Sequence, residues 1–216
     1  IHLLSTSTHA GMAYEIDMRL RPSGNSGMLV SSLSSFEKYQ QQSAWTWEHQ
    51  ALVRSRVIAG DKITAECFNT IRVNQLRTKR NTEKLRDDVA EMRIKMRKHL
   101  DKSTKEGKYC LKQASGGIVD IEFMVQFAVL AWSHKSEALV QWTDTVRLLE
   151  TMSNTDVISQ QQAQQLIEAY KIFRSAAHDL QLQNQPAEVL LSKFTEQREA
   201  VRLCWQSFLS NHKQED

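Results

Sequence analysis

The chain has 216 residues, of which 41% are hydrophobic and 25% charged, so it is long enough to bury a sizeable core. Lys and Arg number 28 against 25 Asp and Glu, and this small excess argues against nucleic-acid binding, which usually requires a strongly basic surface. No uncharged apolar run approaches the length that spans a bilayer, so we expect no membrane-embedded segment. Seven Gly and two Pro favour long helices, and three well-separated cysteines favour a reducing, cytoplasmic location.

The first informative segment is residues 14–21, where apolar and charged side chains alternate until Pro22. This alternation predicts a half-buried strand, because successive side chains of a strand point to opposite faces. Tyr14 and its apolar partners are then expected in a core. The opposite face is expected to carry four charged side chains, namely Glu15, Asp17, Arg19 and Arg21. Residues 22–27 contain two glycines and predict a turn.

A strand face of this kind points to nucleotide chemistry. Magnesium binds carboxylate and phosphate oxygens, and guanidinium groups match the geometry of phosphate, so Asp17 beside Arg19 and Arg21 suits a nucleotide site. The alternative is an exposed strand face with an ion pair to a neighbouring strand. The spacing of the residues does not decide between the two.

The rest of the chain is predicted to be mostly helical. A helix over residues 45–52 is followed by alternation over residues 53–58, which predicts a second strand carrying Arg54 and Arg56. A short extended piece is expected at residues 109–112, before a helix that is apolar nearly all round. Helical periodicity marks the segments from residue 61 onward, 85–100, 118–132, 144–152, 159–182 and 192–209. We expect a small α+β part over residues 1–79 and an all-helical part over residues 80–216.

Other catalytic chemistry finds little support in the sequence. No histidine pair or Cys-x-x-Cys motif favours zinc, and neither a Walker loop nor a Gly-x-Ser-x-Gly motif occurs. Asp120 and Glu122 stand in the first turns of the apolar helix, where the helix dipole favours negative charge. Lys112 is positioned to offset one of them in a structural ion pair.

Three segments resemble the bacterial glutamine-synthetase adenylyltransferases, also called glutamate-ammonia ligase adenylyltransferases. They are residues 14–30 (YEIDMRLRPSG and GMLV), residues 44–54 (AWTWEHQALVR) and residues 116–123 (GGIVDIEF). The family carries two nucleotidyltransferase halves: the N-terminal half removes AMP from glutamine synthetase and the C-terminal half attaches it. The segments are similar to the C-terminal half, and the chain resembles a fragment that starts after the family's N-terminus and ends at its natural C-terminus.

The resemblance implies a mainly α fold: part of a nucleotidyltransferase palm of the DNA polymerase beta type, followed by a helical domain like that of the uridylyltransferases. The implied reaction transfers AMP from ATP to a tyrosine of glutamine synthetase, with Mg²⁺. Asp17 matches the third metal-binding carboxylate of such palms. From the geometry of the predicted strands, we expect Arg19, Arg21 and Ser23 to orient phosphates and Arg54 or Arg56 to close the same pocket. The paired carboxylates of the palm are expected upstream, so these 216 residues are not expected to catalyse alone.

The family motif around the two adjacent glycines has an open role. We expect a structural contact between the two parts, in which Gly116 and Gly117 permit close approach while Asp120 and Glu122 anchor the helix to the palm; Lys112 belongs to the same motif. Two alternatives to the adenylylating enzyme remain. The chain is then either the deadenylylating half, or its helical part is a binding module for glutamine synthetase or the PII signal protein. Whether Glu15 joins the metal site also stays open.

Overall fold

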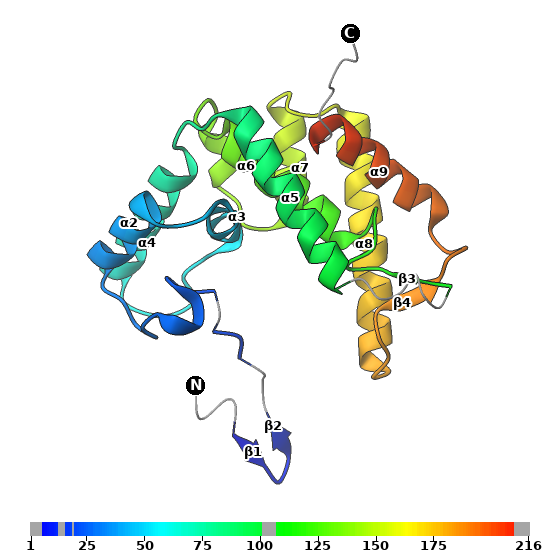
Figure 1. Cartoon of the computed structure of the whole chain (residues 1–216), viewed down its shortest axis with the longest axis horizontal. Helices are drawn as coiled ribbons and strands as arrows, with labels where there is room; N and C mark the ends of the chain where they lie inside the picture. The colour runs from blue at the N-terminus through cyan, green and yellow to red at the C-terminus, as the bar shows by residue number, and fades with distance from the viewer. Residues whose placement is uncertain (1–5, 13–15, 19, 101–106, 210–216) are drawn as a thin grey trace.

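The computed structural model describes residues 6–12, 16–18, 20–100 and 107–209, and helices dominate it, which confirms the mainly α expectation (Figure 1). The helices are α2 (Leu33–Gln42), α3 (Thr46–Arg54), α4 (Lys62–Leu76), α5 (Thr82–Leu100), α6 (Ile118–Trp132), α7 (Thr145–Asn154), α8 (Gln160–Leu182) and α9 (Thr195–Leu209). Two antiparallel strand pairs accompany them, β1 (Ser7–Thr8) with β2 (Gly11–Met12) and β3 (Lys108–Cys110) with β4 (Glu188–Leu190). The described ranges contain no helix that is both long and apolar enough to cross a membrane.

Helix α6 is the centre of the fold. It is buried on nearly all sides, as its uninterrupted apolar sequence predicts, and it packs against α3, α5, α7, α8 and α9. The fully buried side chains of Ile121, Met124 and Phe127 fill the space between these helices. The predicted bounds, residues 118–132, agree with the observed helix.

Side-chain caps begin several helices where the sequence places a suitable residue. Ser32 accepts a hydrogen bond from the Ser35 amide at the start of α2, and Asp144 accepts one from Arg147 at the start of α7. Ser159 and Gln162 form a reciprocal capping box at the start of α8. The starts of α7 and α8 confirm the helices predicted over residues 144–152 and 159–182.

The first predicted strand is wrong for the residues that the structure describes. Residues 16–18 have no regular secondary structure and the Leu20 side chain is 71% exposed, while residues 14, 15 and 19 lie outside the described ranges. A strand requires a neighbour to complete its backbone hydrogen bonds. No described strand lies beside residues 16–18.

The second predicted strand, residues 53–58, is also wrong. Val53 and Arg54 belong to the last turn of α3, and residues 55–58 have no regular structure. A tertiary contact explains this helix end, because the buried Arg72 guanidinium donates to the carbonyls of Leu52 and Val53 at 2.9 and 2.8 Å. The Leu52 carbonyl also accepts hydrogen bonds from the Ser55 amide and hydroxyl, at 3.2 and 2.8 Å. The alternating pattern of the sequence carries no sign of the Arg72 donor about 20 residues away.

Helices on both sides of the predicted division at residue 79 share one core. Leu52, Val53 and Leu76 lie in the same hydrophobic cluster as α6. Polar contacts join the same helices: the Ser133 hydroxyl donates to the Leu76 carbonyl at 2.8 Å. The sheets of the described residues have two strands each, so the palm expected over residues 1–79 stays a prediction.

Candidate functional site

A cavity of about 400 Å³ lies where α3 meets α6 and α8. Its polar lining comes from distant parts of the sequence, with Arg54 on α3, Glu122 on α6 and Arg174 on α8. The remaining lining residues are Lys112, Ile118, Ala177, Gln181, Gln185 and Ala187. We call this space the cationic cavity, because three of its side chains are basic and one is acidic.

An ion pair forms part of the lining of the cationic cavity. Arg54 Nη1 lies 2.7 Å from Glu122 Oε1, and the Tyr170 hydroxyl donates to the same oxygen at 3.1 Å. The Glu122 side chain is 13% exposed and that of Arg54 is 44% exposed, so the carboxylate is the more enclosed partner. Burial raises the pKa of Tyr170, which keeps its hydroxyl protonated as a donor.

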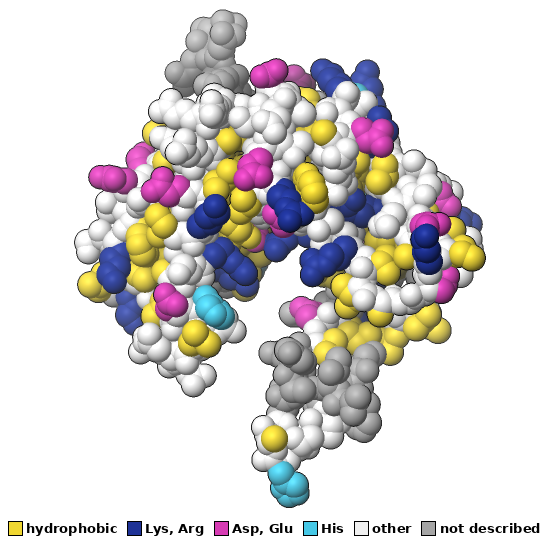
Figure 2. All heavy atoms as spheres, turned by 180° about the vertical axis from the view of Figure 1, so that it is seen from behind, with side chains coloured by type: hydrophobic (Ala, Val, Ile, Leu, Met, Phe, Trp, Pro, Cys, Tyr) yellow, Lys and Arg dark blue, Asp and Glu magenta, His cyan; other side chains and the backbone are white. Residues whose placement is uncertain are grey.

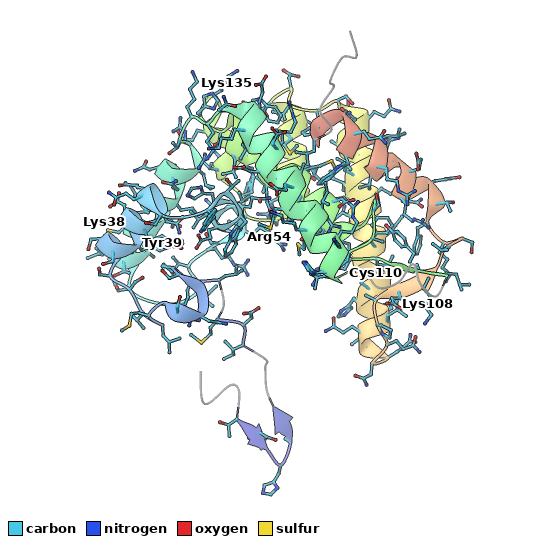
Figure 3. All side chains as sticks on the ribbon, in the orientation of Figure 1. Lys38, Tyr39, Arg54, Lys108, Cys110 and Lys135 are labelled. Carbon is cyan, nitrogen blue, oxygen red and sulfur yellow. The ribbon has the colours of Figure 1, made fainter. Side chains whose placement is uncertain are left out.

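The other two cations of the cavity are not engaged in the same way. Lys112 and Arg174 are exposed, and neither forms an ion pair with any residue that the structure describes. Lys and Arg side chains gather around the concave middle of the face drawn in Figure 2. Figure 3 places Arg54 near the centre of the molecule, away from Lys38 and Lys135.

A second, mainly apolar cavity of about 410 Å³ adjoins Arg54. Two predicted site residues, Arg21 and Arg54, both line it, together with Trp47 and the stacked rings of Phe36 and Phe68, whose centroids are 5.6 Å apart. Arg54 therefore borders both cavities. The structure brings these two predicted arginines to one place even though the predicted strands are absent.

Arg21 and Ser23 shape the turn at the edge of the apolar cavity. The Arg21 guanidinium donates to the backbone carbonyls of Met18, Asn25 and Gly27. Ser23 has a positive φ of 60°, and its carbonyl accepts a hydrogen bond from the Ser26 hydroxyl at 2.7 Å. In this structure Arg21 is thus committed to its own turn.

The remaining predicted residues of the nucleotide site lie apart. Asp17 is exposed in the irregular segment 16–18, and Arg56 is exposed beyond the end of α3, where it lines neither cavity. Arg19 lies outside the described ranges. No group of three His, Cys, Asp or Glu side chains suited to a metal occurs in the described parts of the chain. A magnesium site at Asp17 therefore needs carboxylates from elsewhere.

The glycine motif holds the start of α6 within the helical part. Asp120 is 1% exposed and accepts hydrogen bonds from Arg93 Nε at 2.6 Å, Arg97 Nη2 at 3.2 Å and the Gly116 amide at 2.7 Å. Asp120 therefore anchors α6 to α5, which corrects the expected contact with residues 1–79. Its partners are these arginines and not Lys112. Glu122 does reach across the predicted division, through Arg54.

Several residues of these clusters were not predicted from the sequence. Arg93 follows Leu85 and Val89 at intervals of four residues, which places it on the apolar face of α5. This position in the sequence could have indicated that Arg93 is buried. Arg174 and Tyr170 carry no such signal. They join the site only because α8 packs against α6.

The helical part is of a known type. The family model described as GlnD PII-uridylyltransferase matches residues 83–207, more than half of the chain. The family model described as Glutamate-ammonia ligase adenylyltransferase matches residues 1–71. The chain belongs to the glutamate-ammonia ligase adenylyltransferase family, which confirms the resemblance noted in the sequence.

Three curated relatives share one name. The chain is 49% identical over 216 residues to a bifunctional glutamine synthetase adenylyltransferase/adenylyl-removing enzyme of Pseudomonas putida, with 95% of this chain aligned. It is 46% identical to the enzymes of that name from Nitrosococcus oceani, with 98% aligned, and Vibrio parahaemolyticus, with 97% aligned. The chain spans 22% of the length of each of these relatives.

Proposed function

We propose that the chain is part of the adenylylating half of an enzyme that transfers AMP from ATP to a tyrosine of glutamine synthetase, and so regulates nitrogen assimilation. The observation that carries this proposal is Arg54, which stands between the apolar cavity and the cationic cavity and is held by Glu122. Such a guanidinium suits phosphate groups of ATP. The near 50% identity to enzymes with this name supports the same reaction.

The roles proposed for individual residues follow from this placement. Asp17 would supply one carboxylate to a magnesium ion, and two more would come from polypeptide that precedes this chain in the longer protein. Arg54 would orient phosphate groups. Further phosphate contacts would come from Arg19, Arg21, Ser23 and Arg56. Residues 1–79 would then complete a palm of the DNA polymerase beta type and residues 80–216 its helical domain.

The division of labour explains what these 216 residues are expected to do alone. Bound magnesium would neutralise the charge of the phosphate groups. A single carboxylate is poorly suited to hold the magnesium ions in place for this. The chain contains no Asp-x-Asp pair. We therefore propose that it binds phosphate groups but transfers no AMP by itself, and that it acts in the cytoplasm as part of the longer enzyme.

The second candidate is a docking module for glutamine synthetase or the PII protein. Large apolar side chains at the surface of the helical part favour it, because such side chains often mark protein interfaces. The exposed examples there are Leu182, Leu190, Leu191 and Leu203. The adenylyl-removing half remains the alternative within the enzyme class.

The deciding experiment uses the chain extended upstream as the longer protein has it, and follows labelled AMP from ATP to glutamine synthetase in magnesium. Asp17→Asn is expected to abolish transfer, and Asp179→Asn, an exposed aspartate on α8, serves as the matched control. Full transfer by Asp17→Asn would overturn the metal role. Release of AMP from adenylylated glutamine synthetase with phosphate, without forward transfer, would assign the adenylyl-removing half. Partner binding with neither reaction would favour the docking module.

A further inference from the structure

We infer that the cationic cavity binds a phosphate-bearing anion of about the size of pyrophosphate, held by Lys112 and Arg174 together with Arg54. The site lies between α3 and the helical part, and the proposed function gives no role to Lys112 or Arg174. This inference deepens the proposed function, because Arg54 belongs to both. It is nevertheless tested by binding alone.

The charges of the cavity are unbalanced. Three basic side chains meet a single carboxylate, and that carboxylate is already paired with Arg54 at 2.7 Å. Lys112 and Arg174 therefore leave two positive charges without a carboxylate among the residues that the structure describes. Positive side chains gathered in a hollow attract an anion more strongly than the same charges spread over a convex surface.

The remaining lining favours phosphate over a nucleobase. Gln181 and Gln185 bring side-chain amide groups that can donate hydrogen bonds to phosphate oxygens. The cavity lining in the described structure contains no aromatic ring on which a base would stack. A space of about 400 Å³ accommodates two or three linked phosphate groups.

Glu122 makes the inference specific, because it predicts an effect of the opposite sign. A bound anion competes with the Glu122 carboxylate for Arg54 and is repelled by its charge. Removal of this charge is expected to strengthen binding, whereas removal of a cation is expected to weaken it. A purely structural role for these residues predicts neither change in affinity.

The experiment is isothermal titration calorimetry of the 216-residue chain with inorganic pyrophosphate, at low salt and with EDTA to exclude metal ions. Lys112→Gln and Arg174→Gln are each expected to weaken binding about tenfold, because each removes one charge-assisted contact. Glu122→Gln is expected to bind more tightly than the unaltered chain. Lys135→Gln is the matched control, since Lys135 is exposed and lies away from Arg54 (Figure 3). Thermal unfolding of each variant establishes that it is folded.

Titrations with ATP and AMP identify the source of the phosphate. Binding of pyrophosphate and ATP, but not AMP, supports a site for the triphosphate tail, and binding of pyrophosphate alone supports a free anion. Binding of AMP and ATP without pyrophosphate would overturn the inference, because adenosine would then be the recognised group. Absence of binding, or equal weakening by Lys135→Gln, would also overturn it. Loss of AMP transfer in Asp17→Asn with pyrophosphate binding intact separates this site from the catalytic proposal.

Discussion

At the scale of single residues, the buried ion pair between Arg93 and Asp120 is the most consequential contact of the helical part. Both side chains are almost fully enclosed, at 0% and 1% exposure, and the bond between them is 2.6 Å long. Burial of a charge is costly unless a partner of opposite charge and further hydrogen bonds compensate it. Asp120 has these partners in Arg97 and the Gly116 amide. These contacts give Asp120 a role in holding the fold together.

Asp120→Asn is expected to lower the free energy of unfolding by about 3–5 kcal/mol, because it leaves a buried arginine without its carboxylate. Urea unfolding followed by far-ultraviolet circular dichroism measures the change. Asp179→Asn, on the exposed face of α8, is expected to stay within about 0.5 kcal/mol of the unaltered chain. Equal stabilities for the two variants would show that the Asp120 carboxylate does not support the fold.

His49 predicts a dependence of stability on pH. Its Nε2 lies 3.0 Å from the Gln40 carbonyl oxygen and 2.9 Å from Gln75 Nε2, and burial lowers its pKa below the usual 6.5. The unfolded chain therefore binds a proton near pH 6.5 that the folded chain binds only at lower pH, so stability falls as the pH drops below this value. Above pH 6.5 the contribution of His49 is fully present.

Free energies of unfolding at pH 8 and pH 5.5 test this expectation. His49→Gln is expected to lose less stability between the two pH values than the unaltered chain, because the group that takes up the proton is gone. His178→Gln replaces an exposed histidine on α8 and is expected to retain the original dependence. An unchanged dependence in His49→Gln would contradict the assignment.

At the scale of elements, the junction before α6 depends on a glycine. Gly116 has a φ of +81°, and a Cβ atom there would lie 2.5 Å from the Arg198 carbonyl oxygen of α9. Gly107 also has a positive φ, +68°, but a Cβ atom would meet nothing within 4 Å. The two positions share the backbone preference and differ in the space available.

Gly116→Ala is therefore expected to cost clearly more stability than Gly107→Ala. The latter is expected to lose about 1 kcal/mol from the unfavourable backbone conformation alone, whereas Gly116→Ala must also move α9 away from α6. Urea unfolding of the two variants in parallel measures the difference. Similar losses in both would show that the contact with Arg198 relaxes without cost.

At the scale of the whole molecule, helices before and after residue 79 are expected to unfold together. Leu76 on α4 is fully buried in the cluster that contains α6, and Arg72 ties α4 to the end of α3 and to the Val140 carbonyl, at 2.9 Å. The structure thus gives the two parts a common core, although the family models match them separately, over residues 1–71 and 83–207.

Leu76→Ala is expected to destabilise the chain by about 2–5 kcal/mol, as large-to-small changes in a core do. Amide hydrogen exchange is expected to accelerate in α6 as well as in α4, because the shortened side chain leaves a cavity in the core that the two helices share. Leu182→Ala, at an exposed site on α8, is the control and is expected to change neither. Faster exchange confined to α4 would mean that the two parts unfold independently.

The sequence by itself determined the helices and the family. The apolar run of α6 and the caps of α2, α7 and α8 act over a few residues, so their effect can be derived from local pattern. Tertiary structure decided the end of α3, the burial of Arg93 and the cationic cavity. Arg72 lies about 20 positions from the carbonyls it binds, and Arg54, Glu122 and Arg174 meet only through helix packing. Local periodicity cannot encode such contacts, because they depend on which helices become neighbours.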